Sequence, residues 1–168
     1  MKTFFKYLSI IFGVVLLDQI TKSILLYLIT GTVPFAGNAW VIVKYPYIMS
    51  NVTDWFNIVF TWNPGASFSM LRNLGEAAPW VIVAATGIVV ALLFYYMFRR
   101  ASAREYLPLT FIIGGALGNL IDRMRFGAVI DFLDLHVGGW HWPAFNVADM
   151  FIVIGVGLYI MKLVFRKK

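Results

Sequence analysis

The stretch GGALGNLIDR, residues 114–123, places polar side chains at the end of an apolar run long enough to cross a membrane. A second polar stretch, PAFNVAD at 143–149, directly precedes another such run, and Asp131 stands between the two in the segment VIDF, residues 129–132. Ionisable groups at membrane depth are costly and mark functional sites by default. These stretches therefore predict both a bundle of membrane helices and the place of its site.

The composition supports a membrane protein with one integral-membrane domain over residues 1–168. The chain is 61% hydrophobic and 13% charged, whereas soluble domains are about 45–50% apolar and about 25% charged. The net charge of +6 comes from basic residues at the ends of apolar runs rather than along a surface stripe, which disfavours a nucleic-acid partner. Because cysteine is absent, disulfides and thiolate chemistry are excluded.

The apolar runs predict a helical membrane protein with four transmembrane helices. The second run is 20 residues without a charge, or about 30 Å as a helix, which matches the hydrocarbon thickness. Nine of the 14 basic residues flank one side of the runs, so both termini are expected in the cytoplasm. The four spans are expected at about 7–29, 79–98, 106–124 and 146–165. The nine basic residues are Lys2, Lys6, Arg99, Arg100, Arg104, Lys162, Arg166, Lys167 and Lys168.

The segment between the first two spans is expected outside the cell membrane. Residues 40–45 and 55–62 are rich in aromatic and β-branched side chains, which favour strands. An external β-rich segment at about 40–70 is therefore predicted to form a small sheet on the membrane surface. Residues 125–145 contain Gly138 and Gly139 and are expected to be a tight return loop between the last two spans.

Two aspartates are placed at the same depth by this topology. Asp131 follows the outer end of the third span, and Asp149 lies in the first turn of the fourth. Two carboxylates within hydrogen-bond reach share one proton, which suits the hydrolysis of a peptide bond by activated water. The spacing equally allows a structural reading, in which Asp131 ends one helix and Asp149 stabilises the positive end of the next.

The remaining polar residues also have structural readings. Gly115 and its neighbouring glycines suit close helix packing, and Asn119 and Arg123 share a helix face with it. Asp18 and Lys22 are spaced for a helical ion pair. His136 and His141, near Asp134, do not have zinc-ligand spacing, so no metal site is predicted. The segment NPGASF, residues 63–68, suits a turn.

Five motifs in this sequence resemble those of the bacterial lipoprotein signal peptidase (signal peptidase II) family. They are DQITK at 18–22, NPGASFS at 63–69, GGALGNLIDR at 114–123, GAVIDF at 127–132 and PAFNVAD at 143–149. The resemblance implies a four-span inner-membrane protein with a small external sheet and an active site near the periplasmic side. Pro64 and the length of the 31–53 loop depart from the family pattern.

The resemblance further implies an aspartic endopeptidase with Asp131 and Asp149 as its catalytic dyad. Its substrates would be diacylglyceryl-modified prolipoproteins, cleaved before the lipidated cysteine beside membrane lipids, without a cofactor and with globomycin as an inhibitor. Asp134 matches no motif and is expected to tolerate substitution. The alternative class is a small proton-linked transporter or channel subunit. Supporting roles are implied for Asp18, Asn63, Gly115, Asn119, Asp122, Arg123 and Asn146.

Overall fold

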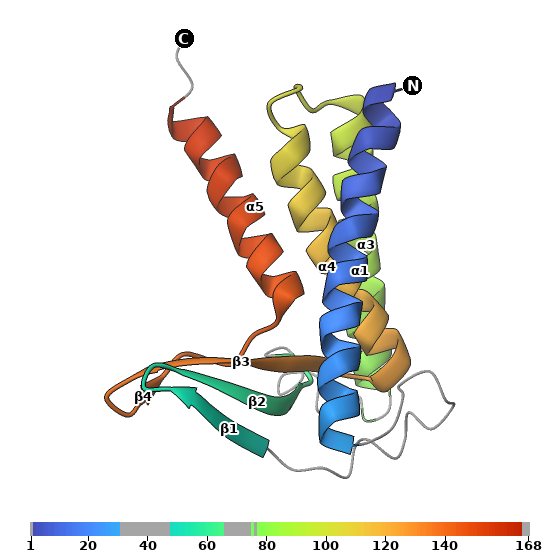
Figure 1. Ribbon diagram of the computed structural model, residues 1–168. Helices are drawn as coiled ribbons and strands as arrows, with labels where there is room; N and C mark the ends of the chain where they lie inside the picture. The colour runs from blue at the N-terminus through green and yellow to red at the C-terminus, as the bar shows by residue number, and fades with distance from the viewer. Residues whose placement is uncertain (1, 31–47, 66–74, 76, 166–168) are drawn as a thin grey trace.

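The structure is a computed structural model that describes residues 2–30, 48–65, 75 and 77–165. These residues form long helices and one antiparallel sheet (Figure 1). The helices are α1 (Lys2–Thr30), α3 (Ala78–Arg99), α4 (Tyr106–Phe126) and α5 (Val147–Val164). The strands are β1 (Ile48–Thr53), β2 (Phe56–Asn63), β3 (Val129–Val137) and β4 (Trp140–His141).

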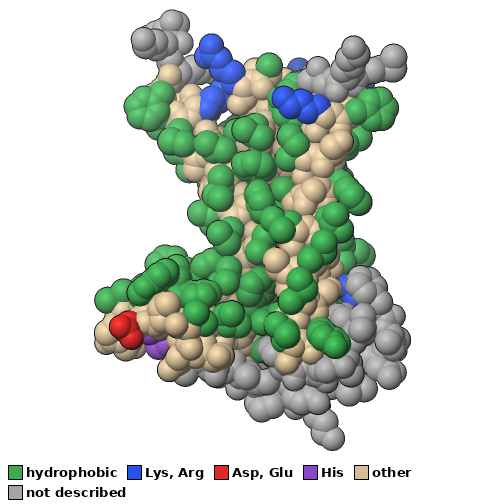
Figure 2. Space-filling view, in the orientation of Figure 1, with side chains coloured by type: hydrophobic (Ala, Val, Ile, Leu, Met, Phe, Trp, Pro, Cys, Tyr) green, Lys and Arg blue, Asp and Glu red, His purple; other side chains and the backbone are tan. Residues whose placement is uncertain are grey.

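The helices run along one another, and the sheet lies across one end of them (Figure 1). Helix α1 begins and α5 ends at the opposite end, where the connection between α3 and α4 also lies. Lys and Arg side chains gather at that end in Figure 2. The start of α1 and the end of α5 therefore lie at the same end of the helix bundle.

Three helices in the described part of the chain are long and apolar enough to cross a membrane: α1, α3 and α5. Large apolar side chains on these helices face outward, including Phe12 (67% exposed), Leu92 (61%) and Val153 (70%). Figure 2 shows this apolar surface around the middle of the molecule. Such a surface is unfavourable in water and is typical of helices surrounded by lipid.

Helix α4 is less apolar than the other three helices and carries Asn119, Asp122, Arg123 and Arg125 in its second half. It contacts each of the other helices and has the longest set of buried residues. The polar side chains of α4 are therefore accommodated by contacts with the neighbouring helices. The third expected span, at about 106–124, corresponds to this helix, although α4 is less apolar than the three helices above.

The sheet has the order β1-β2-β3-β4, with antiparallel neighbours. The expected strand at 55–62 is confirmed as β2, whereas the one at 40–45 lies outside the described residues. The expected return loop at 125–145 is wrong in one respect, because most of it is β3 and β4. β3 consists largely of β-branched and aromatic or aliphatic residues that pair with β2, and Gly138 and Gly139 make the turn with positive φ.

A glycine joins α4 to the sheet. Gly127 ends the helix at φ 75°, a left-handed conformation that glycine adopts without strain, and β3 begins two residues later. Apolar packing then fixes the sheet against the end of α1, which holds β3 at the outer ends of the helices. The buried residues in this cluster are Leu25, Leu26, Phe60, Ile130 and Phe132.

The opposite end of the bundle is held by the buried Glu105. Its carboxylate accepts hydrogen bonds from the Ser102 backbone N–H at 2.6 Å and from Tyr96 Oη at 3.2 Å, and it pairs with Lys162 Nζ at 2.6 Å. The bonds from Lys162 and Ser102 lower the pKa of Glu105 to about 2. This cluster ties the end of α3 and the start of α4 to the end of α5.

Candidate active site

Asp149 is held by the start of α5. The Asn146 side chain accepts a hydrogen bond from the Asp149 backbone N–H at 2.9 Å, and the Asp149 carboxylate accepts one from the Asn146 backbone N–H at 3.2 Å. This reciprocal capping box satisfies two amides at the helix N-terminus. It also fixes the Asp149 side chain in the first turn, as the structural reading of the sequence predicted.

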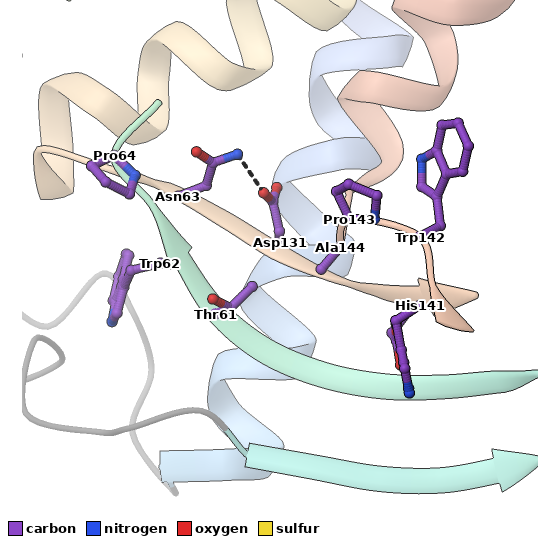
Figure 3. Close-up of a pocket in the computed structure, with 10 residues that line it drawn as sticks. Thr61, Trp62, Asn63, Pro64, Asp131, His141, Trp142, Pro143 and Ala144 are labelled. Carbon is purple, nitrogen blue, oxygen red and sulfur yellow. Dashed lines mark hydrogen bonds and ion pairs between the residues drawn. The ribbon is translucent and has the colours of Figure 1, made fainter. Parts of the chain in front are cut away.

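Asp131 lies on β3 and is 1% exposed. Its Oδ2 accepts a hydrogen bond from Asn63 Nδ2 at 2.8 Å, and its Oδ1 accepts one from Asn146 Nδ2 at 2.7 Å. Figure 3 shows the Asn63 side chain directed at this carboxylate from β2. The structural reading for Asp131 is wrong, since α4 ends at Gly127 and Asp131 caps no helix.

A chain of amides joins the two carboxylates. Asn119 Nδ2 donates to Asp149 Oδ1 at 2.8 Å, and Asn119 Oδ1 accepts a hydrogen bond from Asn146 Nδ2 at 3.1 Å. Asn146 thereby contacts Asp131, Asn119 and the Asp149 backbone. Side chains from β2, α4 and the start of α5 thus orient both carboxylates within one network.

A buried lysine supports this network from α1. Lys22 Nζ lies 2.8 Å from Asp18 Oδ2, 2.8 Å from Asp122 Oδ2 and 3.2 Å from Asn119 Oδ1. The predicted Asp18–Lys22 ion pair is therefore confirmed, but it extends to a second carboxylate. Asp122 Oδ2 also accepts a hydrogen bond from the Ile130 backbone N–H at 3.2 Å, next to Asp131.

Asp18 reaches the other side of the site as well. Its Oδ1 accepts a hydrogen bond from the Ala148 backbone N–H at 2.9 Å, a free amide in the first turn of α5. Gly115 and Gly118 on α4 permit this approach: a Cβ at Gly115 would collide with the Ala148 carbonyl oxygen, and one at Gly118 would lie 2.6 Å from Asp18 Oδ2. Close helix packing is thus the role that the structure gives these glycines.

Arg123 is a cation that interacts with both carboxylates of the candidate dyad. Its guanidinium interacts electrostatically with Asp149, Asp131 and Asp122, and its Nε is buried without a hydrogen-bond partner in the described part of the chain. A fixed cation at this position would stabilise negative charge that develops during a reaction.

Burial raises the pKa of Asp131 to about 6. The hydrogen bond from Asn63 opposes this shift, while the negative charge of Asp149 adds to it. A carboxyl group with this pKa can be protonated near neutral pH, which an ordinary aspartic acid cannot. Asp131 is therefore suited to donate a proton as well as to accept one.

The pKa of Asp131 predicts a pH dependence of stability. Because the folded-state pKa is above the unfolded value of 3.8, the folded protein binds this proton more tightly. The associated stability is complete below pH 4 and is lost as pH rises through about 6, amounting to about 3 kcal/mol. Unfolding of detergent-solubilised protein at pH 4 to 7 measures it. If an Asp131→Asn variant showed the same change of stability with pH, Asp131 would not be the group responsible.

Two cavities meet at the candidate dyad. One, of about 660 Å³, is lined by Asp131, by residues at the end of β2 and by residues 141–144 (Figure 3). The other, of about 510 Å³, is lined by Asp149 and by apolar residues of β3, α5 and the segment before α5. Trp142, Pro143 and Ala144 line both cavities and so form a shared wall.

The structure brings nearly all of the predicted site residues into one region. Asp18, Asn63, Asn119, Asp122 and Asn146 are linked by the hydrogen bonds above, and Gly115 and Arg123 lie beside them on α4. Gln19 also belongs to this region but was not predicted from the sequence; its Nε2 donates to Asp122 Oδ1 at 2.8 Å. The DQITK motif, in which Gln19 follows Asp18, was the only signal for it.

Comparison with known proteins assigns the chain to a class and then to a family. A solved structure described as a bacterial membrane enzyme superposes with a TM-score of 0.71 at 27% identity, covering 97% of this chain and 92% of that one. Lipoprotein signal peptidase of Burkholderia thailandensis is 41% identical over 156 residues, 92% of this chain and 84% of the relative. That of Anaplasma phagocytophilum is 44% identical over 109 residues, 65% of this chain and 69% of the relative.

The fold and these similarities define a multi-pass membrane enzyme. The family model for signal peptidase (SPase) II matches residues 10–165. The chain therefore belongs to the signal peptidase II family, whose members are proteases that remove signal peptides from lipoproteins. This assignment replaces the transporter as the class of protein.

Proposed function

We propose that Asp131 and Asp149 are the catalytic dyad of an aspartic endopeptidase that cleaves diacylglyceryl-modified prolipoproteins before the lipidated cysteine. The observation that carries the proposal is the amide network of Asn63, Asn119 and Asn146, which orients both carboxylates where two cavities meet. Asp18, Gly115, Asp122 and Arg123 support the site through packing and charge.

The proposed reaction needs only these carboxylates and water. Ionised Asp149 takes a proton from a water molecule while the oxygen of that water attacks the scissile carbonyl carbon. Protonated Asp131 gives its proton to the carbonyl oxygen at the same step. Asp149 then protonates the leaving nitrogen, and the carbon–nitrogen bond of the resulting diol breaks. Asp131 recovers its proton from a hydroxyl group of the diol, which becomes the new carboxyl group. The elevated pKa of Asp131 supports its role as the acid.

The two cavities suit the two parts of such a substrate. The cavity beside Asp149 is lined by Met150, Val153 and Ile154 and is almost wholly apolar, as acyl chains require. The cavity beside Asp131 has polar and aromatic walls that suit a peptide backbone. The scissile bond would lie between them, over the dyad.

Cleavage of a synthetic lipidated precursor by purified protein in detergent tests the proposal. We expect cleavage before the modified cysteine, unaffected by EDTA or by serine- and thiol-directed reagents, because the mechanism uses neither metal nor covalent nucleophile. Globomycin should inhibit it by occupying the site. Loss of activity with EDTA that added metal restores would overturn the mechanism.

We further propose that α4 is a fourth span, that the sheet lies on the periplasmic surface of the inner membrane and that the other end of the bundle is cytoplasmic. The position of α4 among the other helices and the basic end in Figure 2 support this orientation. The sheet places Trp55 and Trp140, both exposed, where interfacial aromatic residues collect.

This orientation predicts which single cysteines can be labelled from outside. Since the chain has no cysteine, Val137→Cys near the β3–β4 turn and Ala103→Cys between α3 and α4 each introduce one reactive thiol. A membrane-impermeant maleimide should label the first but not the second in spheroplasts, and both after permeabilisation. Labelling of Ala103→Cys in intact spheroplasts would show that the α3–α4 connection is not cytoplasmic and would refute the proposed orientation.

A further inference from the structure

A second polar cluster lies on the sheet, three residues beyond Asp131. The Asp134 carboxylate is buried and accepts hydrogen bonds from Asn57 Nδ2 at 2.7 Å and from His141 Nδ1 at 2.9 Å. These bonds join β2, β3 and β4. Asp134 therefore lies in β3 rather than in the return loop expected at 125–145.

The contact between Asp134 and His141 is charge-assisted. Burial raises the pKa of Asp134, but the hydrogen bonds from Asn57 and His141 outweigh burial and hold it below the ordinary value, so the group is ionised. His141 Nδ1 must then carry hydrogen, which both the protonated ring and one neutral tautomer provide. The ring of His136 stacks on that of His141, with centroids 5.0 Å apart.

The hairpin that this contact closes is short, and it is also held by a backbone hydrogen bond from the Trp142 N–H to the Leu135 carbonyl oxygen at 2.8 Å. β4 is two residues long and pairs with β3 only through His136↔His141 and Val137↔Trp140. The chain then leaves β4 as residues 142–144, the wall shared by the two cavities, before Phe145 pairs with Leu133. Asp134, His141 and the Trp142–Leu135 backbone bond thus hold one end of the wall, and Phe145 holds the other.

His141 does not point toward the proposed dyad. In Figure 3 its ring is directed away from Asn63 and Asp131, although His141 and Asp134 line the same cavity as these residues. It therefore acts through the backbone that follows it, which passes from β4 along the cavities to Asn146 and Asp149. A displacement of about 1 Å in such a wall misaligns a bound peptide enough to slow the reaction by up to about 100-fold.

We propose that Asp134 and His141 are positioning residues of this peptidase, which fix residues 142–144 so that the scissile peptide is aligned over the dyad. The inference rests on the proposed function of Asp131 and Asp149. Met150, Val153 and Ile154, the side of the apolar cavity that α5 forms, lie outside the 142–144 wall. Loss of the Asp134–His141 contact should therefore lower the rate of the bound complex more than it weakens substrate binding.

Replacement of His141 tests this proposal without disturbing the core, because its side chain is 44% exposed. His141→Leu, which removes the donor, should lower kcat about tenfold per folded molecule and leave KM within about twofold. His141→Asn keeps an N–H near the position of Nδ1 and should restore kcat to within about threefold of wild type. An unchanged kcat in His141→Leu, or no rescue by His141→Asn, would overturn the proposal.

Asp134→Asn extends the test to the partner side chain. Both changes break the Asp134–His141 contact, and Asp134→Asn also weakens the hydrogen bond from Asn57. The double variant Asp134→Asn/His141→Leu should therefore have the kcat of the slower single variant. If the decreases in kcat were additive in the double variant, the two residues would act separately and the proposed pair would be refuted. Asp54→Asn, the same change at an exposed position in the turn between β1 and β2, is the matched control and should leave kcat unchanged.

An Asp131→Asn variant separates this inference from the proposed function. If Asp131→Asn cleaves at the wild-type rate, the dyad assignment fails and the positioning role fails with it. If Asp131→Asn is inactive while His141→Leu keeps the wild-type kcat, the dyad stands and only the positioning role is refuted.

Discussion

Replacing Asp131 or Asp149 by asparagine is expected to remove nearly all cleavage of a lipidated precursor while the protein remains folded. Asparagine keeps the shape of each side chain but cannot exchange a proton with water or substrate. A positioned general acid or base contributes about 10²–10⁴-fold, and the loss of half a dyad should reach or exceed that range. Each Asn variant still offers an oxygen to the surrounding amides, so the network is weakened rather than dismantled.

The measurement is initial cleavage rate per folded molecule, with globomycin binding as an independent report on the site. Asp54→Asn again provides the same chemical change at an exposed position of the sheet. Near-normal turnover by either dyad variant would refute the assignment, because no other described carboxylate lies in the same amide network with a cavity beside it.

Lys22→Met is expected to cause the largest loss of stability of any single change considered. Lys22, Asp18 and Asp122 are all at most 2% exposed, and the ammonium group is 2.8 Å from each carboxylate. Removing it leaves two buried carboxylates facing each other without a cation, and breaking a buried ion pair in this way costs about 3–5 kcal/mol. The apolar replacement fills most of the volume, so the cost is electrostatic.

Denaturant unfolding in detergent measures this loss, and Lys6→Met serves as the control because Lys6 is exposed on the same helix. Since Lys22 also bonds Asn119, whose amide reaches Asp149, some decrease in turnover should accompany the decrease in stability. Equal midpoints for Lys22→Met and wild type would show that the cluster contributes no net stability.

The sequence predicted those parts of the fold that depend on local pattern. Apolar run length located the helices to within a few residues, because the hydrocarbon thickness sets a minimum length. The polar residues of α4 stood out for the same reason, as they interrupt such a run. The family motifs then indicated which of these residues belong to one site.

Contacts between distant segments could not be predicted in this way. Lys22 was predicted to pair with Asp18 because the two are four residues apart on one helix. Its pairing with Asp122, 100 positions later, could not be predicted because no local sequence pattern indicates it. The glycines at 138 and 139 suggested a turn, but β3 was missed because its pairing partner β2 lies on the far side of two spans. The hydrogen bonds that Asp134 makes to β2 and β4 were missed for the same reason.

The ion cluster of α1 has a consequence for how the protein is made. The ribosome completes α1 about 80 residues before it reaches α4, which at about 5–20 residues per second leaves an interval of seconds. During that time the helix must reside in lipid with an aspartate and a lysine and without Asp122. Their spacing of four residues lets each neutralise the other within a single helix. A newly inserted α1 therefore carries its own temporary counterion, and α4 completes the cluster on arrival.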